Sequence, residues 1–120
     1  MASIIVTIGR EINGPFEGTR IGKARGVWML HEEDWAAFRE RVLHALTEYG
    51  TVVFGGKGYG VNPYDKDSQE ESACFIMVEP EEWVPSDDRH LRAKLAAIGK
   101  EYGQLEIGWT LGCYEPVKVS

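Results

Sequence analysis

The chain has 120 residues, of which 43% are hydrophobic and 27% charged, so it is long enough and apolar enough to form one globular domain with its own core. Nineteen Asp and Glu against thirteen Lys and Arg give a net charge of −6. This charge argues against a nucleic acid partner, because phosphate contacts need clustered positive charge.

Cysteine use and the shortness of the apolar runs indicate the compartment. Cys74 and Cys113 are the only cysteines, and both lie in apolar, strand-like runs, as is typical of a protein in a reducing cytoplasm. The run Ile4–Val6 is far too short for a signal peptide or a membrane span. We therefore expect a cytoplasmic protein without membrane contact.

The N-terminal part combines a strand with a long connection. Ser3–Ile8 is β-branched and apolar, which predicts a central strand. Residues 11–30 form a glycine-rich inserted loop, which either holds a short extra hairpin or is functional, because loops of this length are unusual inside a compact domain. Its apolar end, Val27–Leu30, is expected to pack over the start of a helix.

Next come a helix and a pair of strands. His31–Tyr49 has an acidic first turn, apolar residues at spacings of three and four, and Gly50 as its stop. Thr51–Phe54 and Ala73–Val78 are short β-branched or aromatic runs, which predict two paired central strands with a glycine-rich, polar connection between them.

The C-terminal part repeats the helix-then-strand order. Ser86 before two aspartates predicts a helix start, and Gly103 predicts its end. Apolar residues alternate with polar ones or glycine over residues 105–112, which predicts a half-buried last strand, and residues 115–120 form a tail.

The predicted order is β-α-β-β-α-β in a single α+β domain over residues 1–120, the ferredoxin-like topology with an antiparallel sheet and both helices on one face. One sheet face is then open. Its cover is expected to be the long loop, the tail or a second subunit, so we predict a homo-oligomer, a dimer or larger. The residues assigned to the open face are Thr7, Val53, Phe75, Met77, Ile107 and Trp109.

Four short motifs carry a resemblance. These are Thr7–Arg10, the first helix with Trp35, Glu70–Ser72 before the third strand, and Tyr102–Gln104 at the end of the second helix. With them the chain resembles a group of small uncharacterised bacterial and bacteriophage proteins of ferredoxin-like order, from which residues 11–30 depart. The resemblance implies a phage or accessory gene product, which would act in the host cytoplasm, and brings no activity, catalytic residues or cofactor.

A glycine-rich segment and a basic loop are the candidate binding site. Residues 55–60 read GGKGYG after a strand, and backbone amides beside a lysine can cradle a phosphate. Residues 61–63 follow where a Walker loop needs a helix, so the alternative is a flexible or bulged hairpin end. Glu70 or Glu71 is expected to pair with Arg10 across neighbouring strands. The candidate ligand-binding residues are Arg10, Arg20, Lys23, Arg25, Gly55, Gly56, Lys57, Gly58, Tyr59 and Glu71.

No pattern in the sequence indicates catalysis or a metal. The three histidines have no zinc-type spacing, and neither cysteine lies at a helix start where its thiolate would be favoured. We therefore expect no catalytic residue, metal or cofactor. The basic loop and the glycine-rich segment favour a non-catalytic accessory protein that sequesters a small anionic, nucleotide-like ligand. The acidic body of the chain and the apolar cluster at Trp28 favour instead one that blocks a host protein in an anti-defence role.

Two alternatives stay open at this point. The first is a cofactor-independent enzyme of the dimeric α+β barrel type, which has the same topology and rests on fold analogy alone. The second is a structural component of a virion. The basic loop itself has a simpler explanation, since four basic residues in a long connection can merely be solvated.

Overall fold

The computed structural model describes residues 2–12, 21–24, 27–62, 65–113, 115 and 117–119, and for residues 21–24, 27, 61–62 and 65–68 it describes the backbone alone. These residues form, in chain order, β1 (Ala2–Gly9), β2 (Glu11–Ile12), β3 (Ile21–Ala24), β4 (Val27–Leu30), α1 (Glu32–Tyr49), β5 (Thr51–Asn62), β6 (Asp65–Val78), α2 (Pro85–Glu101) and β7 (Gly108–Cys113).

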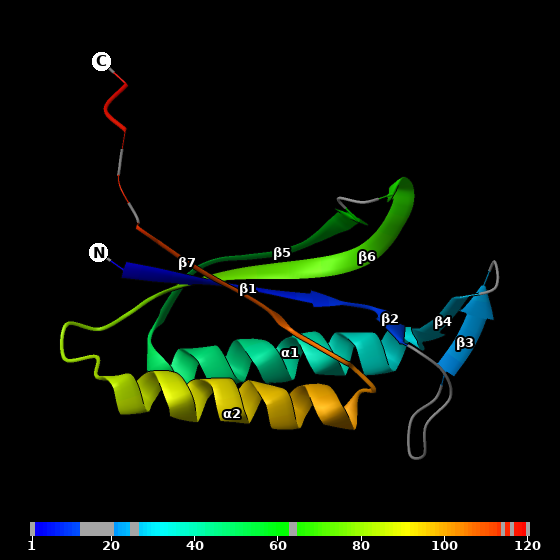
Figure 1. The fold of residues 1–120 in the computed structure, drawn as a ribbon, viewed down its shortest axis with the longest axis horizontal. Coiled ribbons are helices and arrows are strands. Elements are labelled where there is room, and N and C mark those ends of the chain that lie inside the picture. The colour runs from blue at the N-terminus through cyan, green and yellow to red at the C-terminus, as the bar shows by residue number, and fades with distance from the viewer. Residues whose placement is uncertain are drawn as a thin grey trace.

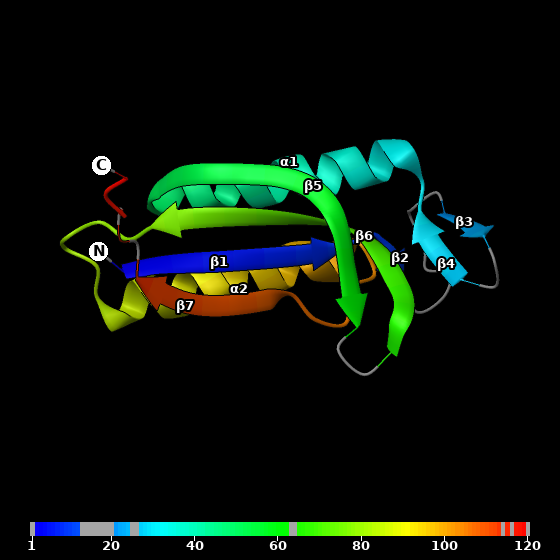
Figure 2. The same cartoon turned by 90° about the horizontal axis from the view of Figure 1, so that it is seen from above.

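The main layer is a four-stranded sheet in the order β5-β6-β1-β7, in which each neighbouring pair is antiparallel. Both helices lie side by side along one face of this sheet (Figure 1). The view from above shows the four strands running along the helices, with β5 and β7 on the two edges (Figure 2). The α+β class and the antiparallel sheet with two helices, predicted from the sequence, are confirmed.

Helix α1 has the boundaries that its sequence predicts. The imidazole Nδ1 of His31 accepts a hydrogen bond from the Glu33 amide at 3.4 Å and caps the first turn, while the Gly50 amide donates to the carbonyl of Leu46 at 3.0 Å. Its buried residues, at spacings of three and four, are Trp35, Phe38, Val42, Ala45 and Leu46.

Helix α2 begins earlier than its sequence predicts. The N-cap is Val84 rather than Ser86, because Pro85 fits the first helical turn and Asp87 accepts a hydrogen bond from the Val84 amide at 2.9 Å. At the other end Gly103 has φ of 70°, a left-handed conformation that favours glycine, so the predicted stop is confirmed.

The core lies between the sheet and the helices. On the two central strands every second residue faces the helices, namely Ile4, Val6 and Ile8 on β1 and Ala73, Phe75 and Met77 on β6. The assignment of Phe75, Met77 and Trp109 to the open sheet face was therefore wrong, since Trp109 lies opposite Val6 and packs against the core. Their register explains it, since Phe75 lies opposite Val6 and Met77 opposite Ile4, and opposed residues share a face.

The inserted segment of residues 11–30 contains a second, three-stranded sheet in the order β2-β4-β3. The predicted extra hairpin is thus present as β3 and β4, which pair from Ile21 and Leu30 to Ala24 and Val27. This small sheet stands at one end of the molecule, beyond the start of α1 (Figure 1). Leu30 is fully buried and Trp28 packs against the core, which confirms the predicted packing of this apolar end.

The last strand differs from its prediction. Strand β7 spans Gly108–Cys113 and pairs with β1 from Thr7 opposite Gly108 to Ala2 opposite Cys113, whereas the predicted strand began at residue 105. The chain turns into β2 soon after Gly9, so β1 offers little to pair with residues 105–107. Residues 115 and 117–119 of the tail have no regular secondary structure.

Strand β5 is longer than predicted and lies at an edge rather than in the centre. It continues through the glycine-rich residues 55–60, which pair with residues 70–75 of β6. The expectation of a loop or hairpin end at these glycines was therefore wrong. Pairing with β6 supplies the hydrogen bonds that override the poor strand propensity of glycine.

Candidate functional site

The β5–β6 hairpin extends beyond the rest of the sheet. Strand β1 pairs with β6 only as far as Gly9 opposite Ser72, while the two arms of the hairpin pair with each other on to Asn62 and Asp65. Beyond the end of β1 the hairpin curves away from the helices (Figures 1 and 2). This curvature makes one wall of a concave surface.

A cleft of about 710 Å³ lies at this surface. Four segments that are distant in sequence line it: the end of β1, the residues of β2, the far part of the hairpin, and the connection from α2 to β7. Its lining residues that carry a polar or aromatic group beyond the backbone are Thr7, Glu11, Phe54, Lys57, Tyr59, Glu70, Ser72, Cys74, Gln104 and Glu106.

Two glycines let polar side chains lie close against the sheet within this cleft. A Cβ on Gly9 would meet Oε1 of Glu70 at 2.0 Å, and a Cβ on Gly108 would meet Oγ1 of Thr7 at 1.9 Å. The Glu70 carboxylate and the Thr7 hydroxyl therefore occupy the space that side chains at positions 9 and 108 would need. Both groups lie on the sheet face opposite the helices.

Glu70 is held in place at the rim of the cleft. Its Oε1 accepts a hydrogen bond from the Glu11 amide at 2.8 Å, and its own carbonyl accepts one from the Ser72 hydroxyl at 2.9 Å. Burial raises the pKa of the Glu70 carboxyl, with the nearby Glu11 charge adding to the rise and the Glu11 amide opposing it.

Arg10 and Glu71 lie on the other face of the sheet and form an ion pair there. Nη1 of Arg10 lies 2.7 Å from Oε2 of Glu71 and 3.0 Å from Oε2 of Glu32, and Nε donates to the carbonyl of Leu30 at 2.8 Å. The indole Nε1 of Trp35 donates to Oε1 of Glu71 at 3.2 Å. The predicted pairing of Arg10 with one of the two glutamates is confirmed, and this cluster joins β1, β6 and the start of α1.

The structure brings only some of the predicted binding residues together at the cleft. Gly56, Lys57, Gly58 and Tyr59 line the cleft together, whereas Gly55 lies against the Phe75 ring, which a Cβ there would meet at 2.8 Å. Arg10 and Glu71 are occupied with each other and do not line the cleft. Arg20 and Arg25 lie outside the described residues, and of Lys23 only the backbone in β3 is described.

The strand conformation of residues 55–60 changes what they offer a ligand. In a strand successive amides point in opposite directions, so they do not converge on one anion as they do in a glycine loop before a helix. Lys57 and Tyr59 border the cleft from this edge strand, but Lys57 lies opposite Ala73 and Tyr59 opposite Glu71, so both side chains leave β5 on the helix side of the sheet.

Sequence reasoning missed eight of the ten polar or aromatic lining residues, namely Thr7, Glu11, Phe54, Glu70, Ser72, Cys74, Gln104 and Glu106. Strand alternation was a usable signal for Glu70, because Glu70 and Glu71 are adjacent in a strand and must face opposite sides. Nothing in the pattern indicated Gln104 or Glu106, which reach the cleft from an irregular connection.

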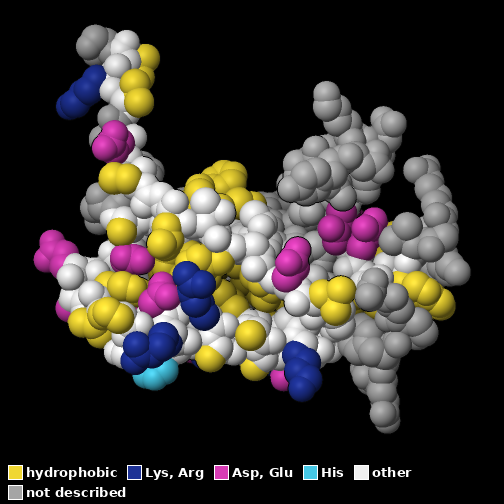
Figure 3. Space-filling view, in the orientation of Figure 1, with side chains coloured by type: hydrophobic (Ala, Val, Ile, Leu, Met, Phe, Trp, Pro, Cys, Tyr) yellow, Lys and Arg dark blue, Asp and Glu magenta, His cyan; other side chains and the backbone are white. Residues whose placement is uncertain are grey.

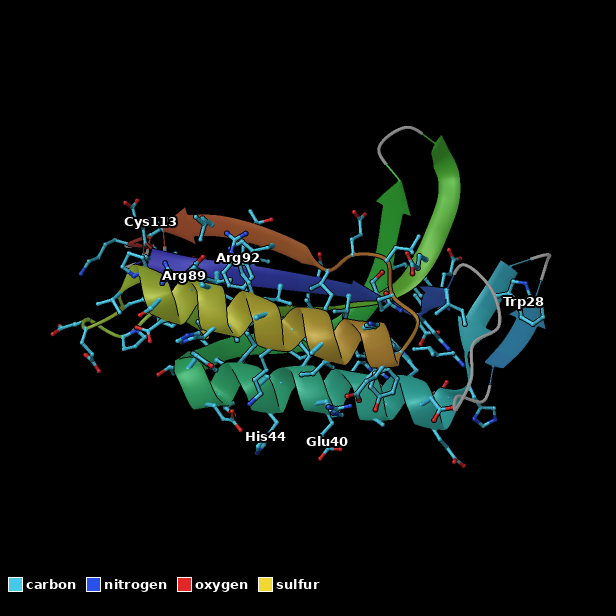
Figure 4. The ribbon with its side chains drawn as sticks, turned by 60° about the horizontal axis from the view of Figure 1, so that its bottom comes forward. Trp28, Glu40, His44, Arg89, Arg92 and Cys113 are labelled. Carbon is cyan, nitrogen blue, oxygen red and sulfur yellow. The ribbon has the colours of Figure 1, made fainter. Side chains whose placement is uncertain are left out.

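The other chemically active side chains do not gather into a site. His31, His44 and His90 are exposed, and Figure 4 shows His44 projecting from α1 away from α2. Cys74 is half-buried, and Cys113 is exposed with its Sγ 3.9 Å from Oε1 of Glu115. Within the described part of the chain, no group of three or more His, Cys, Asp and Glu side chains is arranged to hold a metal ion.

The surface between α2 and β7 is partly covered by the side chain of Arg92. Figure 3 shows hydrophobic side chains along the band between the strands and the helices, with basic side chains over part of it. The guanidinium of Arg92 lies 4.5 Å from the centre of the Trp109 ring, and Figure 4 shows Arg92 rising from α2 toward β7. The groove left there measures about 240 Å³.

Comparison with known proteins gave no assignment: no protein-family model and no curated protein matches this sequence. Among the described residues, no helix is both long and apolar enough to cross a membrane. The geometry of the cleft is therefore the basis for a functional proposal.

Proposed function

We propose that this chain is a non-catalytic binding protein that takes up a small anionic, nucleotide-like ligand in the cleft beside the β5–β6 hairpin. The cleft itself is the observation that carries the proposal. Its volume of about 710 Å³ falls within the range of small-molecule sites, which is roughly 300–1,000 Å³.

The charges of the cleft suit a ligand with two different ends. Among the described lining residues Lys57 is the one cation, whereas Glu11, Glu70 and Glu106 contribute carboxylates. Ionised carboxylates only accept hydrogen bonds, so they favour amino or imino groups, while an ammonium favours phosphate. A nucleotide carries both kinds of group, with its phosphate for Lys57 and the donor edge of its base for the glutamates.

The aromatic residues of the cleft suit a planar ligand. Phe54 is 60% exposed and shares the face of β5 on which Glu70 lies, whereas Tyr59 is 73% exposed on the opposite face of the strand. Stacking of a base on such a ring contributes about 1–3 kcal/mol and is tolerant of base identity. The lining glycines at positions 56, 58 and 60 leave room for a flat ligand to approach the strand backbone.

The blocking of a host protein is the version that we favour less. It was motivated by the apolar cluster around Trp28, and this residue is partly buried and packs against the core. Figure 4 shows Trp28 on the small sheet, where it lies opposite Ile12. The basic residues Arg20, Lys23 and Arg25 stay predicted contributors to anion binding.

We also propose that the fold is ferredoxin-like and that the chain forms a homo-oligomer. We further propose that it is an accessory protein of phage type that acts in the cytoplasm. The strand order β5-β6-β1-β7, with a helix between β1 and β5 and another between β6 and β7, supports the ferredoxin-like order. The half-buried free thiol of Cys74 supports a reducing compartment.

A cofactor-independent enzyme is the second candidate, and Glu70 is the observation that favours it. This carboxyl has a raised pKa and lines the cleft, as is expected of a group that acts as an acid or a base. The binding protein and the enzyme differ in what happens to the bound compound. A ligand recovered chemically unchanged after incubation with the protein supports binding, whereas conversion that is lost in Glu70→Gln would establish the enzyme.

Replacement of Lys57 tests the anionic end of the proposed ligand. Titration calorimetry with guanosine monophosphate and with guanosine should show tighter binding of the phosphorylated compound. In Lys57→Ala the dissociation constant for the monophosphate should rise about tenfold and that for guanosine should not change, because one charged hydrogen bond is lost.

Lys100→Ala is the matched control, since Lys100 is exposed at the end of α2 and does not line the cleft. It should bind the monophosphate as the wild-type protein does. Equal loss in both variants would indicate an unspecific charge effect, and no loss in Lys57→Ala would remove Lys57 from the site.

A further inference from the structure

We propose that the outer edge of β5 pairs with β5 of a second copy of this chain. The two strands would run antiparallel across a two-fold axis and join two four-stranded sheets into one continuous sheet. The inference names the surface of the proposed homo-oligomer. Because Phe54 and the glycines of β5 also line the cleft, the second copy would border the proposed ligand site.

The first argument is the free edge itself. Among the described residues β5 pairs with β6 alone, although it is 12 residues long. Residues 51–60 are exposed except for Val52, and Lys57 is the single charged residue among them. An edge of this length with one charge and no proline is a ready template for pairing with another strand.

The second argument comes from the face pattern of β5. A bulge lies between Val52 and Phe54, so regular alternation begins at Phe54. Phe54, Gly56, Gly58 and Gly60 then share one face, because side chains in a strand alternate.

Antiparallel strands set residues of the same face opposite each other. A two-fold axis at residue 55, 56 or 57 therefore sets Phe54 opposite Gly56, Gly58 or Gly60 of the second copy, respectively. In all three registers the exposed Phe54 ring falls on a glycine.

The third argument is that the single chain does not itself require two of these glycines. A Cβ on Gly58 would have no atom within 4 Å, and one on Gly56 would meet only the Phe54 ring at 3.9 Å. Gly103 is the one glycine with positive φ among the described residues, so neither position needs glycine for its backbone. Glycine weakens a strand, and space for the second copy's Phe54 gives a reason for it.

The fourth argument is charge complementarity beside the strand. A groove of about 690 Å³ between β5 and α1 is lined by Ala36, Arg39, Glu40 and Leu43 of the helix. Nε of Arg39 is buried there and has no acceptor in the described part of the chain. Figure 4 shows Glu40 projecting outward from α1. The same groove is lined by residues 52–57 of β5, so the two-fold axis proposed at this part of β5 would also pass beside Arg39 and Glu40 of α1. It would place Arg39 of each copy against Glu40 of the other.

Sedimentation of the full chain tests the proposal. The wild-type protein should be a dimer at concentrations of about 100 μM, and Phe54→Asp should raise the dissociation constant of the dimer by more than about tenfold, since it sets two carboxylates in the shared edge. Phe54 is 60% exposed, so the aspartate fits the isolated chain, and far-ultraviolet circular dichroism verifies that the variant is folded.

Leu105→Asp is the matched control. Leu105 is 80% exposed, lies outside β5, and receives the same change in charge. It should leave the dimer intact. A wild-type protein that stays monomeric at all concentrations would overturn the proposal, as would a dimer that persists in Phe54→Asp or one that both variants dissociate equally.

Discussion

Two consecutive glutamates, Glu70 and Glu71, have different surroundings because strand β6 points them to opposite faces of the sheet. Glu71 faces the helix side, where it accepts hydrogen bonds from Arg10 at 2.7 Å and Trp35 at 3.2 Å. Glu70 faces the cleft, where the Glu11 amide is its donor. One carboxylate therefore holds the fold together, and the other is available at the candidate site.

Arg10→Ala should destabilise the protein rather than act on ligand binding directly. The Arg10 side chain is 16% exposed and its loss leaves the partly buried Glu71 without its cation, so the free energy of unfolding should fall by about 2–3 kcal/mol. Urea unfolding measures this. Arg41→Ala, which removes a surface ion pair with Glu101, should have a much smaller effect. Equal losses would contradict the structural role assigned to Arg10.

Glu70→Gln should change how stability depends on pH. Burial raises the pKa of Glu70 in the folded state, so its contribution to stability is fully present below its ordinary pKa of 4.5 and is lost as pH rises through the raised value. Glutamine keeps an acceptor for the Glu11 amide and carries no charge. The stability of Glu70→Gln relative to the wild-type protein should therefore increase with pH, in urea unfolding at a series of pH values. A difference that is constant with pH, or that falls, would show that Glu70 is not desolvated.

Among the elements, the helices followed most directly from the sequence and β5 least. The spacing of Trp35, Phe38, Val42 and Leu46 predicts α1 because a helix buries one stripe of its own residues. Strand β5 owes its length to a partner. Its glycines have no strand propensity of their own, and only the opposite arm, residues 70–75, makes them a strand.

Predictions from local sequence were also wrong for the start of α2 and for the length of β7, because residues elsewhere determine both. Ser86 is a better N-cap than Val84 by residue type, yet Pro85 and the Asp87 hydrogen bond start α2 two residues earlier. In the last strand, alternation continued through residue 105, but pairing ends where Gly108 lies opposite Thr7, two residues before the end of β1. Alternation predicts which face a residue takes, whereas the length of a strand depends on its neighbour.

At the scale of the whole molecule, the cleft is a product of topology. The hairpin contributes Lys57 and Tyr59, β1 contributes Thr7, and the connection after α2 contributes Gln104 and Glu106. The sequence predicted the hairpin part of this set from its composition. It could not predict the remainder, because nothing local indicates that residues 104–106 lie beside the ends of β1 and β6.

Filling the cleft is the most direct test of the account. Gly58 lines the cleft, and a Cβ there would have no atom within 4 Å, so Gly58→Trp adds a bulky ring without a clash in the folded chain. Thr110→Trp is the control, since Thr110 is exposed on β7 and does not line the cleft. The measurement is titration calorimetry with the four ribonucleoside monophosphates, with thermal unfolding to verify that both variants are folded.

We predict that at least one monophosphate binds the wild-type protein with a dissociation constant below about 1 mM, that Thr110→Trp binds it equally, and that Gly58→Trp weakens it by more than about tenfold. Binding that is unchanged in a folded Gly58→Trp, or no binding of any of the four to the wild-type protein, would contradict the assignment of this cleft as a nucleotide-like ligand site.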